Sequence, residues 1–162
     1  MKIKSRHHLR GSEAKKIVAA IEPLLSDSSS LKKASLERAE TDEDVDLIFV
    51  DSRPLIMFID DQPFFTIIGA IELSPQKKLV VVDSGAVKFI ANGADVMSPG
   101  IVFADPDIKP DDLVVVVEEK HKRPLAIGKA LIPAGEMHGE GKAVKSLHHV
   151  GDQIWKGLEQ AE

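Results

Sequence analysis

The segment Val80–Ile101, VVVDSGAVKFIANGADVMSPGI, constrains the fold of this chain more than any other part of it. It continues an apolar run that predicts a buried strand over Leu79–Val82. Asp83-Ser84 follows with residue types that begin helices, and Asn92-Gly93 ends the helix, because glycine takes the left-handed conformation without a steric penalty. We therefore expect a strand, a short helix and a glycine turn, with no set of side chains that could perform catalysis.

The composition of this short helix predicts that it is amphipathic. Its apolar positions are Ala86, Val87, Phe89, Ile90 and Ala91. After the helix, Ala94–Met97 is expected to form the next strand, and Ser98-Pro99-Gly100 to turn out of it, because proline and glycine favour turns. Such a segment presents a helix and backbone N–H groups to a ligand.

The rest of the chain is predicted to consist mainly of short strands. Ser12 is expected to cap a helix over Glu13–Leu25, while Lys32–Glu40 fits either a strand or a helix. Gly128 marks a bulge or a close backbone approach. Apolar runs between polar turns predict strands at Val45–Val50, Leu55–Ile59, Leu113–Val117, Leu125–Ile132 and Lys142–Leu147, and a last helix covers Asp152–Gln160.

Charge and turn residues divide the chain into two predicted modules. Residues 1–39 hold nine Lys/Arg and four Asp/Glu, whereas residues 40–76 hold one and nine. Ser74–Lys78 combines a Ser-Pro turn with two lysines before a new apolar strand, so we place the domains at 1–76 and 77–158. The net charge of −5 argues against a wholly basic nucleic-acid binder but leaves room for a local basic face.

The composition also points to a soluble cytoplasmic protein without a cofactor or metal ion. The chain has no cysteine, no membrane-spanning apolar run and no signal-peptide core. The adjacent histidines of His7-His8 and His148-His149 lack the spacing of metal ligands. We expect His148 instead to form a hydrogen bond near the start of the last helix.

No motif in the chain predicts catalysis. Gly139-Glu140-Gly141-Lys142 lacks the first glycine of a phosphate-binding loop, and Ala143 follows it where such a loop needs Ser or Thr. Paired carboxylates such as Asp60-Asp61 and Asp111-Asp112 fall in turns, where we expect them to be solvated. The chain is therefore predicted not to be an enzyme, although an enzyme of unknown type stays open.

An ordered set of short motifs resembles the PUA domain, an RNA-binding module. The set consists of Asp83, Gly85-Ala86, Gly93-Ala94, Pro99-Gly100-Ile101, Asp112–Val116, Ala126–Ala130, Gly141–Val144, His148 and Asp152–Trp155. With an additional amino-terminal module that contains Pro63–Thr66, the chain resembles the small translation-machinery-associated family, which includes the protein multiplied in T-cell malignancies and the amino half of ligatin. The length fits an archaeal member.

This resemblance implies an α+β fold, in which a PUA pseudo-barrel of about six strands follows a small α/β module. It also implies that RNA lies against the short helix, its glycine loop and the next strand. The implied RNA-binding residues are Lys88, Asn92, Gly93, Ala94, Met97, Ser98, Gly100, Lys129 and Lys142. The alternatives are that the glycines only shape turns, that Lys88 lies on a solvated helix face, and that Trp155 fills the core rather than stacking on bases.

The resemblance implies a non-catalytic role in translation. Its RNA would be tRNA or the rRNA of the small ribosomal subunit, in initiation or recycling, with an initiation-factor-like protein as a possible partner. Two other roles stay open: an RNA-binding accessory to a tRNA or rRNA modification enzyme, and a protein–protein adaptor that uses the acidic segment Glu40–Asp61.

Overall fold

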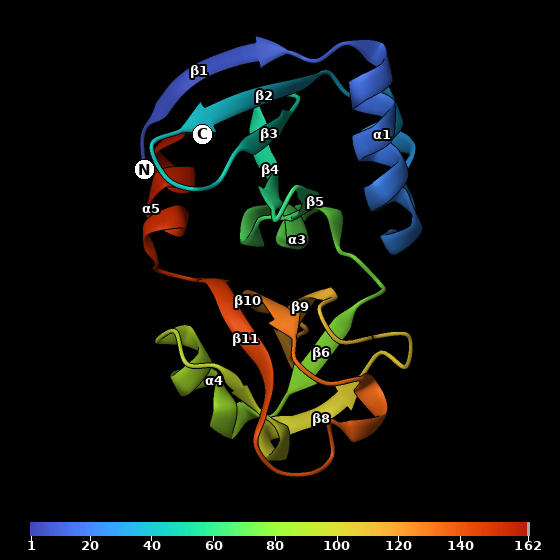
Figure 1. The fold of residues 1–162 in the computed structure, drawn as a ribbon, viewed down its shortest axis with the longest axis vertical. Helices are drawn as coiled ribbons and strands as arrows, with labels where there is room; N and C mark the ends of the chain where they lie inside the picture. Colours follow the sequence, from blue (N-terminus) through green and yellow to red (C-terminus); the bar gives the residue numbers. More distant parts are fainter. Residues whose placement is uncertain (162) are drawn as a thin grey trace. The chain divides into compact units, whose positions relative to one another are not determined.

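The computed structural model describes residues 1–161. Contacts divide the chain into two compact units: Met1–Gln76 with the chain from Lys156 onward, and Lys77–Trp155. Each unit holds one sheet with short helices, so the predicted α+β class is confirmed (Figure 1). The division into independent domains at 1–76 and 77–158 stays a prediction, and residues 156–158 group with the first unit rather than the second.

The amino-terminal unit is built on an antiparallel five-stranded sheet in the order β1-β2-β3-β4-β5. Its strands are β1 (Ile3–His8), β2 (Leu36–Thr41), β3 (Leu47–Val50), β4 (Arg53–Ile59) and β5 (Gln62–Phe65). Its helices are α1 (Gly11–Ile21), α2 (Ser29–Lys33) and α3 (Ile67–Leu73). The buried core includes Ile21, Leu47, Ile48, Ile56 and Phe65, each 0% exposed.

Two tight turns join the hairpins of this sheet. Asp51 and Ser52, between β3 and β4, have φ of 48° and 70°, and Asp60 and Asp61, between β4 and β5, have φ of 50° and 62°. Positive φ at both central residues matches the right-handed twist of the flanking strands. The predicted β3–β4 hairpin is therefore confirmed, with its turn shortened to Asp51-Ser52.

Two local predictions about the amino-terminal unit need correction or completion. Ser12 does not cap α1, because the helix begins one residue earlier at Gly11, and Arg10 precedes it without a side-chain cap. The helix ends at Ile21, and a 3-10 turn that contains Pro23 continues to Leu24. The open choice at Lys32–Glu40 resolves mainly as strand β2, since its backbone pairs with both β1 and β3.

The second unit holds a six-stranded sheet in the order β7-β11-β10-β9-β6-β8. Its elements are β6 (Leu79–Val82), α4 (Ser84–Ala91), β7 (Val96–Met97), β8 (Ile101–Ala104), β9 (Leu113–Glu118), β10 (Pro124–Ala130) and β11 (Lys142–His149), followed by α5 (Gln153–Ala161), which continues beyond the unit. Strands β6 and β9 are parallel, and the other pairs are antiparallel. The result is the predicted near-closed pseudo-barrel of six strands. Strand β8 was not predicted.

The interior of this unit explains two sequence features. The bulge predicted at Gly128 is confirmed, because the β10–β11 register shifts between Ile127 and Gly128. A Cβ at Gly128 would overlap Val144 and lie 2.7 Å from the Lys145 carbonyl oxygen. Trp155 is partly buried, which leaves both alternatives for its role open. Within residues 1–161, no helix has the length and apolar character needed to cross a membrane.

Candidate nucleic-acid interface

Helix α4 is fixed at both ends by local hydrogen bonds. The Asp83 carboxylate accepts a hydrogen bond from the Ala86 N–H at 3.0 Å, which caps the first turn. At the other end, Gly93 has φ of +94°, and its N–H donates to the Ile90 carbonyl at 3.0 Å. The Ala94 N–H donates to the Phe89 carbonyl, also at 3.0 Å, which completes a Schellman motif. The predicted helix start and glycine stop are therefore confirmed.

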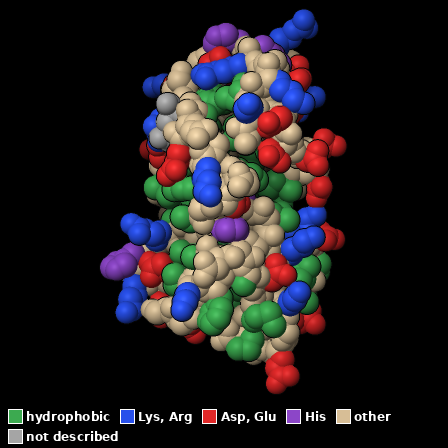
Figure 2. Space-filling model, turned by 90° about the vertical axis from the view of Figure 1, so that its left-hand side faces the viewer, with side chains coloured by type: hydrophobic (Ala, Val, Ile, Leu, Met, Phe, Trp, Pro, Cys, Tyr) green, Lys and Arg blue, Asp and Glu red, His purple; other side chains and the backbone are tan. Residues whose placement is uncertain are grey.

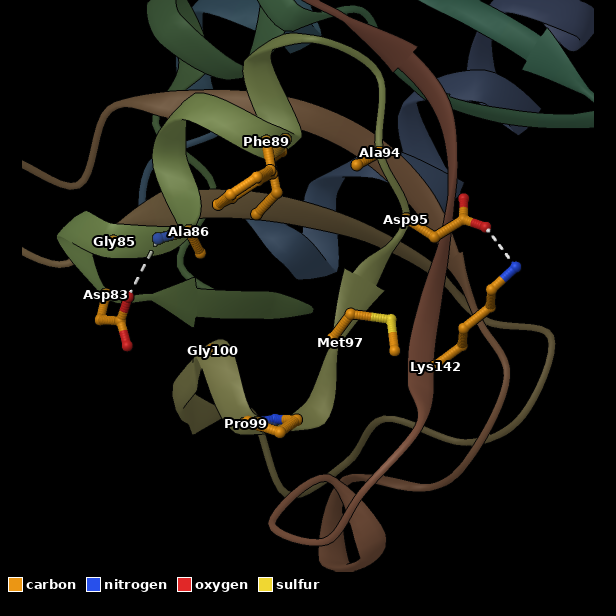
Figure 3. A pocket seen from close by; sticks show the side chains of 11 residues that line it. Asp83, Gly85, Ala86, Phe89, Ala94, Asp95, Met97, Pro99, Gly100 and Lys142 are labelled. Atoms are coloured by element: carbon orange, nitrogen blue, oxygen red, sulfur yellow. Dashed lines mark hydrogen bonds and ion pairs between the residues drawn. The ribbon is translucent and has the colours of Figure 1, made fainter.

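A groove of about 550 Å³ lies beside this helix, and we call it the α4 groove. It is lined by Asp83, Gly85, Ala86, Phe89, Ile90, Ala94, Asp95, Met97, Pro99, Gly100 and Lys142. Figure 3 shows Asp83 and Gly85 on one side, Asp95 and Lys142 on the other, and Phe89 and Met97 between them. A Cβ at Gly100 would lie 3.2 Å from the Ala86 Cβ, so this glycine lets the turn approach the helix closely.

The α4 groove is mainly apolar, with a fixed ion pair at its rim. Lys142 Nζ lies 3.3 Å from Asp95 Oδ2, and Asp95 Oδ1 accepts a hydrogen bond from the Ser146 N–H at 2.9 Å. That backbone hydrogen bond, together with Lys142, holds the pKa of the Asp95 carboxyl below its usual value. Two carboxylates, of Asp83 and Asp95, thus stand against one lysine. The groove suits an uncharged planar group such as a base better than a phosphate.

The structure brings together some of the residues predicted to bind RNA and separates others. Ala94, Met97, Gly100 and Lys142 line the α4 groove. Lys88 and Asn92 are exposed on α4 and at its end, but they do not line the groove. Whether any of these residues contacts RNA stays a prediction.

The other three predicted residues occupy different environments. Gly93 faces the ring of His149, since a Cβ there would lie 2.9 Å from His149 Nε2. Ser98 is 1% exposed, and its N–H donates to the Gly141 carbonyl at 2.8 Å, so this residue shapes the turn in the structure. Lys129 lies on β10 with a half-buried side chain.

Phe89 lines the groove, although it is not among the residues that the sequence predicts to bind RNA. It was counted among the apolar positions of α4, yet it is 65% exposed, and Ile90 is the buried residue of that helix. Met97, across the groove, is 46% exposed. A helix of eight residues buries only a narrow face, and that limit was the signal available in the sequence.

The surface around these residues mixes apolar and charged groups. Figure 2 shows hydrophobic side chains, in green, gathered at the lower end of the view among scattered lysine and arginine side chains. Exposed large hydrophobic residues of the second unit include Phe89, Met97, Val102 and Phe103. Within residues 1–161, no group of three or more His, Asp or Glu side chains is arranged to hold a metal ion.

His148 has the structural role that was predicted for it. Its side chain is 0% exposed, and Nδ1 lies 3.0 Å from Asp152 Oδ2. Asp152 also accepts hydrogen bonds from the His149 N–H at 2.9 Å and from the Trp155 N–H at 2.7 Å. Burial raises the pKa of the Asp152 carboxyl, but these hydrogen bonds outweigh it and hold the pKa below its usual value. The carboxylate therefore joins β11 to the first turn of α5.

Comparisons with known proteins agree with this architecture. The family model of the PUA domain matches residues 78–151. An uncharacterized protein of Methanocaldococcus jannaschii is 45% identical over 159 residues, which cover 96% of this chain and 98% of the relative. Translation machinery-associated protein 20 of Saccharomyces cerevisiae is 30% identical over 136 residues, which cover 76% and 73% of the two chains.

A solved structure is similar over nearly the whole chain. It is the crystal structure of a hypothetical protein from the hyperthermophilic archaeon Pyrococcus horikoshii OT3, with a TM-score of 0.86 and 40% sequence identity. The match covers 95% of this chain and 99% of the other, so both sheets have counterparts in that protein.

Proposed function

The chain belongs to the family of translation machinery-associated protein 20 and carries a PUA domain at residues 78–151, and from this membership we propose that it is a non-catalytic RNA-binding protein of the translation apparatus. Its expected targets are tRNA and the rRNA of the small ribosomal subunit, in initiation or subunit recycling. On this proposal the protein acts in the cytoplasm, where translation takes place.

The observation that supports this proposal best is the α4 groove. Its exposed Phe89 and Met97 offer an apolar surface on which a base can stack, and Lys142 supplies a cation at the rim. Base–aromatic stacking contributes about 1–3 kcal/mol per base. The groove itself has a volume of about 550 Å³, which is enough space for a base.

The proposal is tested by filter binding of the full chain to unfractionated tRNA and to small-subunit rRNA at several salt concentrations. We expect binding that weakens as salt increases, because phosphate contacts release counterions. Lys88→Glu should weaken binding without lowering the melting temperature, since its side chain is exposed, whereas Lys142→Gln should weaken binding and also remove the ion pair with Asp95. The absence of salt-dependent binding to either RNA would refute the proposal.

A second candidate function, protein binding by the amino-terminal unit, is supported by an acidic cavity of about 370 Å³. It is lined by Arg38, Glu43, Asp44, Val45, Asp46, Phe58, Asp60 and Asp61. Such a surface would suit a basic protein segment. The test uses the double variant Asp44→Asn/Asp61→Asn. A protein that binds the full chain but not this variant, while RNA binding stays unchanged, would establish this function.

A further inference from the structure

A second charged feature of the same unit lies outside the α4 groove. The turn between β9 and β10, Glu119–Arg123, is exposed at every residue, and we call it the β9–β10 tip. It carries Lys120, His121, Lys122 and Arg123 in succession. Three of these side chains are permanent cations near neutral pH, and Glu119 is the only exposed carboxylate among residues 119–123.

The backbone of the tip is held by Glu118, the last residue of β9. The Glu118 carboxylate accepts hydrogen bonds from the backbone N–H groups of Lys120 at 2.9 Å, of Arg123 at 3.3 Å and of His121. The Lys122 N–H donates to the Glu118 carbonyl at 3.0 Å, and the Glu118 N–H donates to the Arg123 carbonyl at 3.1 Å. The turn is thus ordered before any ligand binds, which reduces the entropy lost on binding.

The same hydrogen bonds stabilise the ionised form of the Glu118 carboxyl. Burial raises the pKa of its carboxyl, but the three backbone N–H groups outweigh that effect and hold the pKa below its usual value. The carboxylate therefore faces the main chain of the turn and stays ionised at neutral pH. Its oxygens accept hydrogen bonds from the backbone N–H groups of the turn, which leaves the side chains of Lys120, Lys122 and Arg123 exposed.

Strand pairing places the tip next to the α4 groove. In the parallel β6–β9 pair, Val82 lies opposite Glu118, and the Glu119 N–H donates to the Val82 carbonyl at 3.0 Å. Val82 is followed directly by Asp83, which lines the groove and whose N–H donates to the Gly100 carbonyl at 2.9 Å. The groove and the tip therefore lie at the same end of the sheet. Val82 pairs with the strand that leads into the tip, and the next residue, Asp83, lines the groove.

The two surfaces also complement each other chemically. The groove has two carboxylates and one lysine, so it attracts phosphate poorly, whereas the tip offers three exposed cations. A strand of RNA needs both an apolar place for a base and cations for its phosphates. The two surfaces together supply both.

We infer that the β9–β10 tip is a phosphate-binding site for the RNA strand that leaves the α4 groove at its Asp83 side. This inference rests on the proposed function and deepens it, because it names the residues that supply most of the electrostatic attraction. Lys120, Lys122 and Arg123 each contact a backbone phosphate of the same RNA.

The test compares the salt dependence of binding in three forms of the full chain, with fluorescein-labelled unfractionated tRNA as the probe. They are the wild type, the tip variant Lys120→Gln/Lys122→Gln/Arg123→Gln, and the control variant Lys4→Gln/Lys15→Gln/Lys33→Gln, which removes three exposed cations from the amino-terminal unit. Each lost phosphate contact reduces the magnitude of the slope of log K against log salt by about 0.7–0.9. We expect the magnitude of this slope to fall by about 2 to 3 in the tip variant and by less than about 0.5 in the control variant.

The outcomes separate this inference from the proposed function. If the wild type binds tRNA and the tip variant keeps the same slope, the tip is not a contact, and the inference fails while the proposed function stands. If the wild type shows no binding to tRNA or to small-subunit rRNA, the proposed function fails and the inference with it. Should the tip variant not fold, Arg123→Gln alone decides, with an expected slope change of about 0.7–0.9.

Discussion

The most direct test of the α4 groove is the substitution Phe89→Ala. Phe89 is 65% exposed, so about a third of its side chain is buried. Since full burial of a phenylalanine contributes about 1.5–3 kcal/mol, the change should cost about 0.5–1 kcal/mol of stability. The higher helix propensity of alanine offsets part of that cost. We therefore expect the melting temperature to fall by no more than about 2–4 °C.

The expected effect on RNA binding is larger. If a base stacks on Phe89, its removal should cost about 1–3 kcal/mol of binding free energy, which corresponds to a Kd increase of about 5- to 150-fold. The measurement is fluorescence anisotropy of labelled tRNA at one fixed salt concentration, together with a thermal melt of each variant. The neutral substitution leaves the salt slope unchanged, which distinguishes it from the loss of a cation.

Phe103 provides a matched control. It is also an exposed phenylalanine of the same unit, 51% exposed on β8, but it does not line the α4 groove. We expect Phe103→Ala to bind tRNA within about twofold of the wild type, a free-energy change of at most about 0.4 kcal/mol. Equal Kd values for Phe89→Ala and the wild type, or equal losses in both phenylalanine variants, would refute a base-stacking role for Phe89.

Two further predictions concern stability. Asp152→Ala should lower the free energy of unfolding by about 2–4 kcal/mol, because it removes the cap of α5 and leaves the buried His148 Nδ1 without its partner. Asp152→Asn should cost less, since asparagine also caps helices. Chemical denaturation measures both variants, with the exposed Glu140→Ala as the control. Folding lowers the pKa of Asp152, so the stabilisation from this carboxylate is fully present above the unfolded pKa near 3.9. It is lost as the pH falls through the folded-state pKa, and the free energies of unfolding of the wild type and Asp152→Ala should therefore converge in acid. Gly128→Ala should cost about 1–3 kcal/mol by overpacking against Val144 and the Lys145 carbonyl, whereas Gly135→Ala, where a Cβ meets nothing within 4 Å, should leave the melting temperature unchanged.

The sequence by itself determined the features that depend on neighbours within a few residues. Asp83 as the cap of α4 and Gly93 as its end follow from hydrogen bonds that span three to five residues. The β3–β4 hairpin follows from two apolar runs around a tight turn. The prediction of a six-stranded pseudo-barrel came from the ordered PUA motifs, because the apolar runs alone do not predict it. Strand β8 was not predicted, because its four residues are too few to show a clear hydrophobic periodicity.

Only the tertiary structure decided which of these residues a ligand can reach. Phe89 and Ile90 are adjacent and both apolar, yet one is 65% exposed and the other 2%, because the barrel covers just one side of a short helix. Ser98 is buried although serine is ordinarily exposed, because its turn packs against Gly141 of a distant loop. Lys142 meets Asp95, and Glu119 meets Val82, only through strand pairing. Exposure and proximity depend on contacts between distant parts of the chain, and local sequence does not encode them.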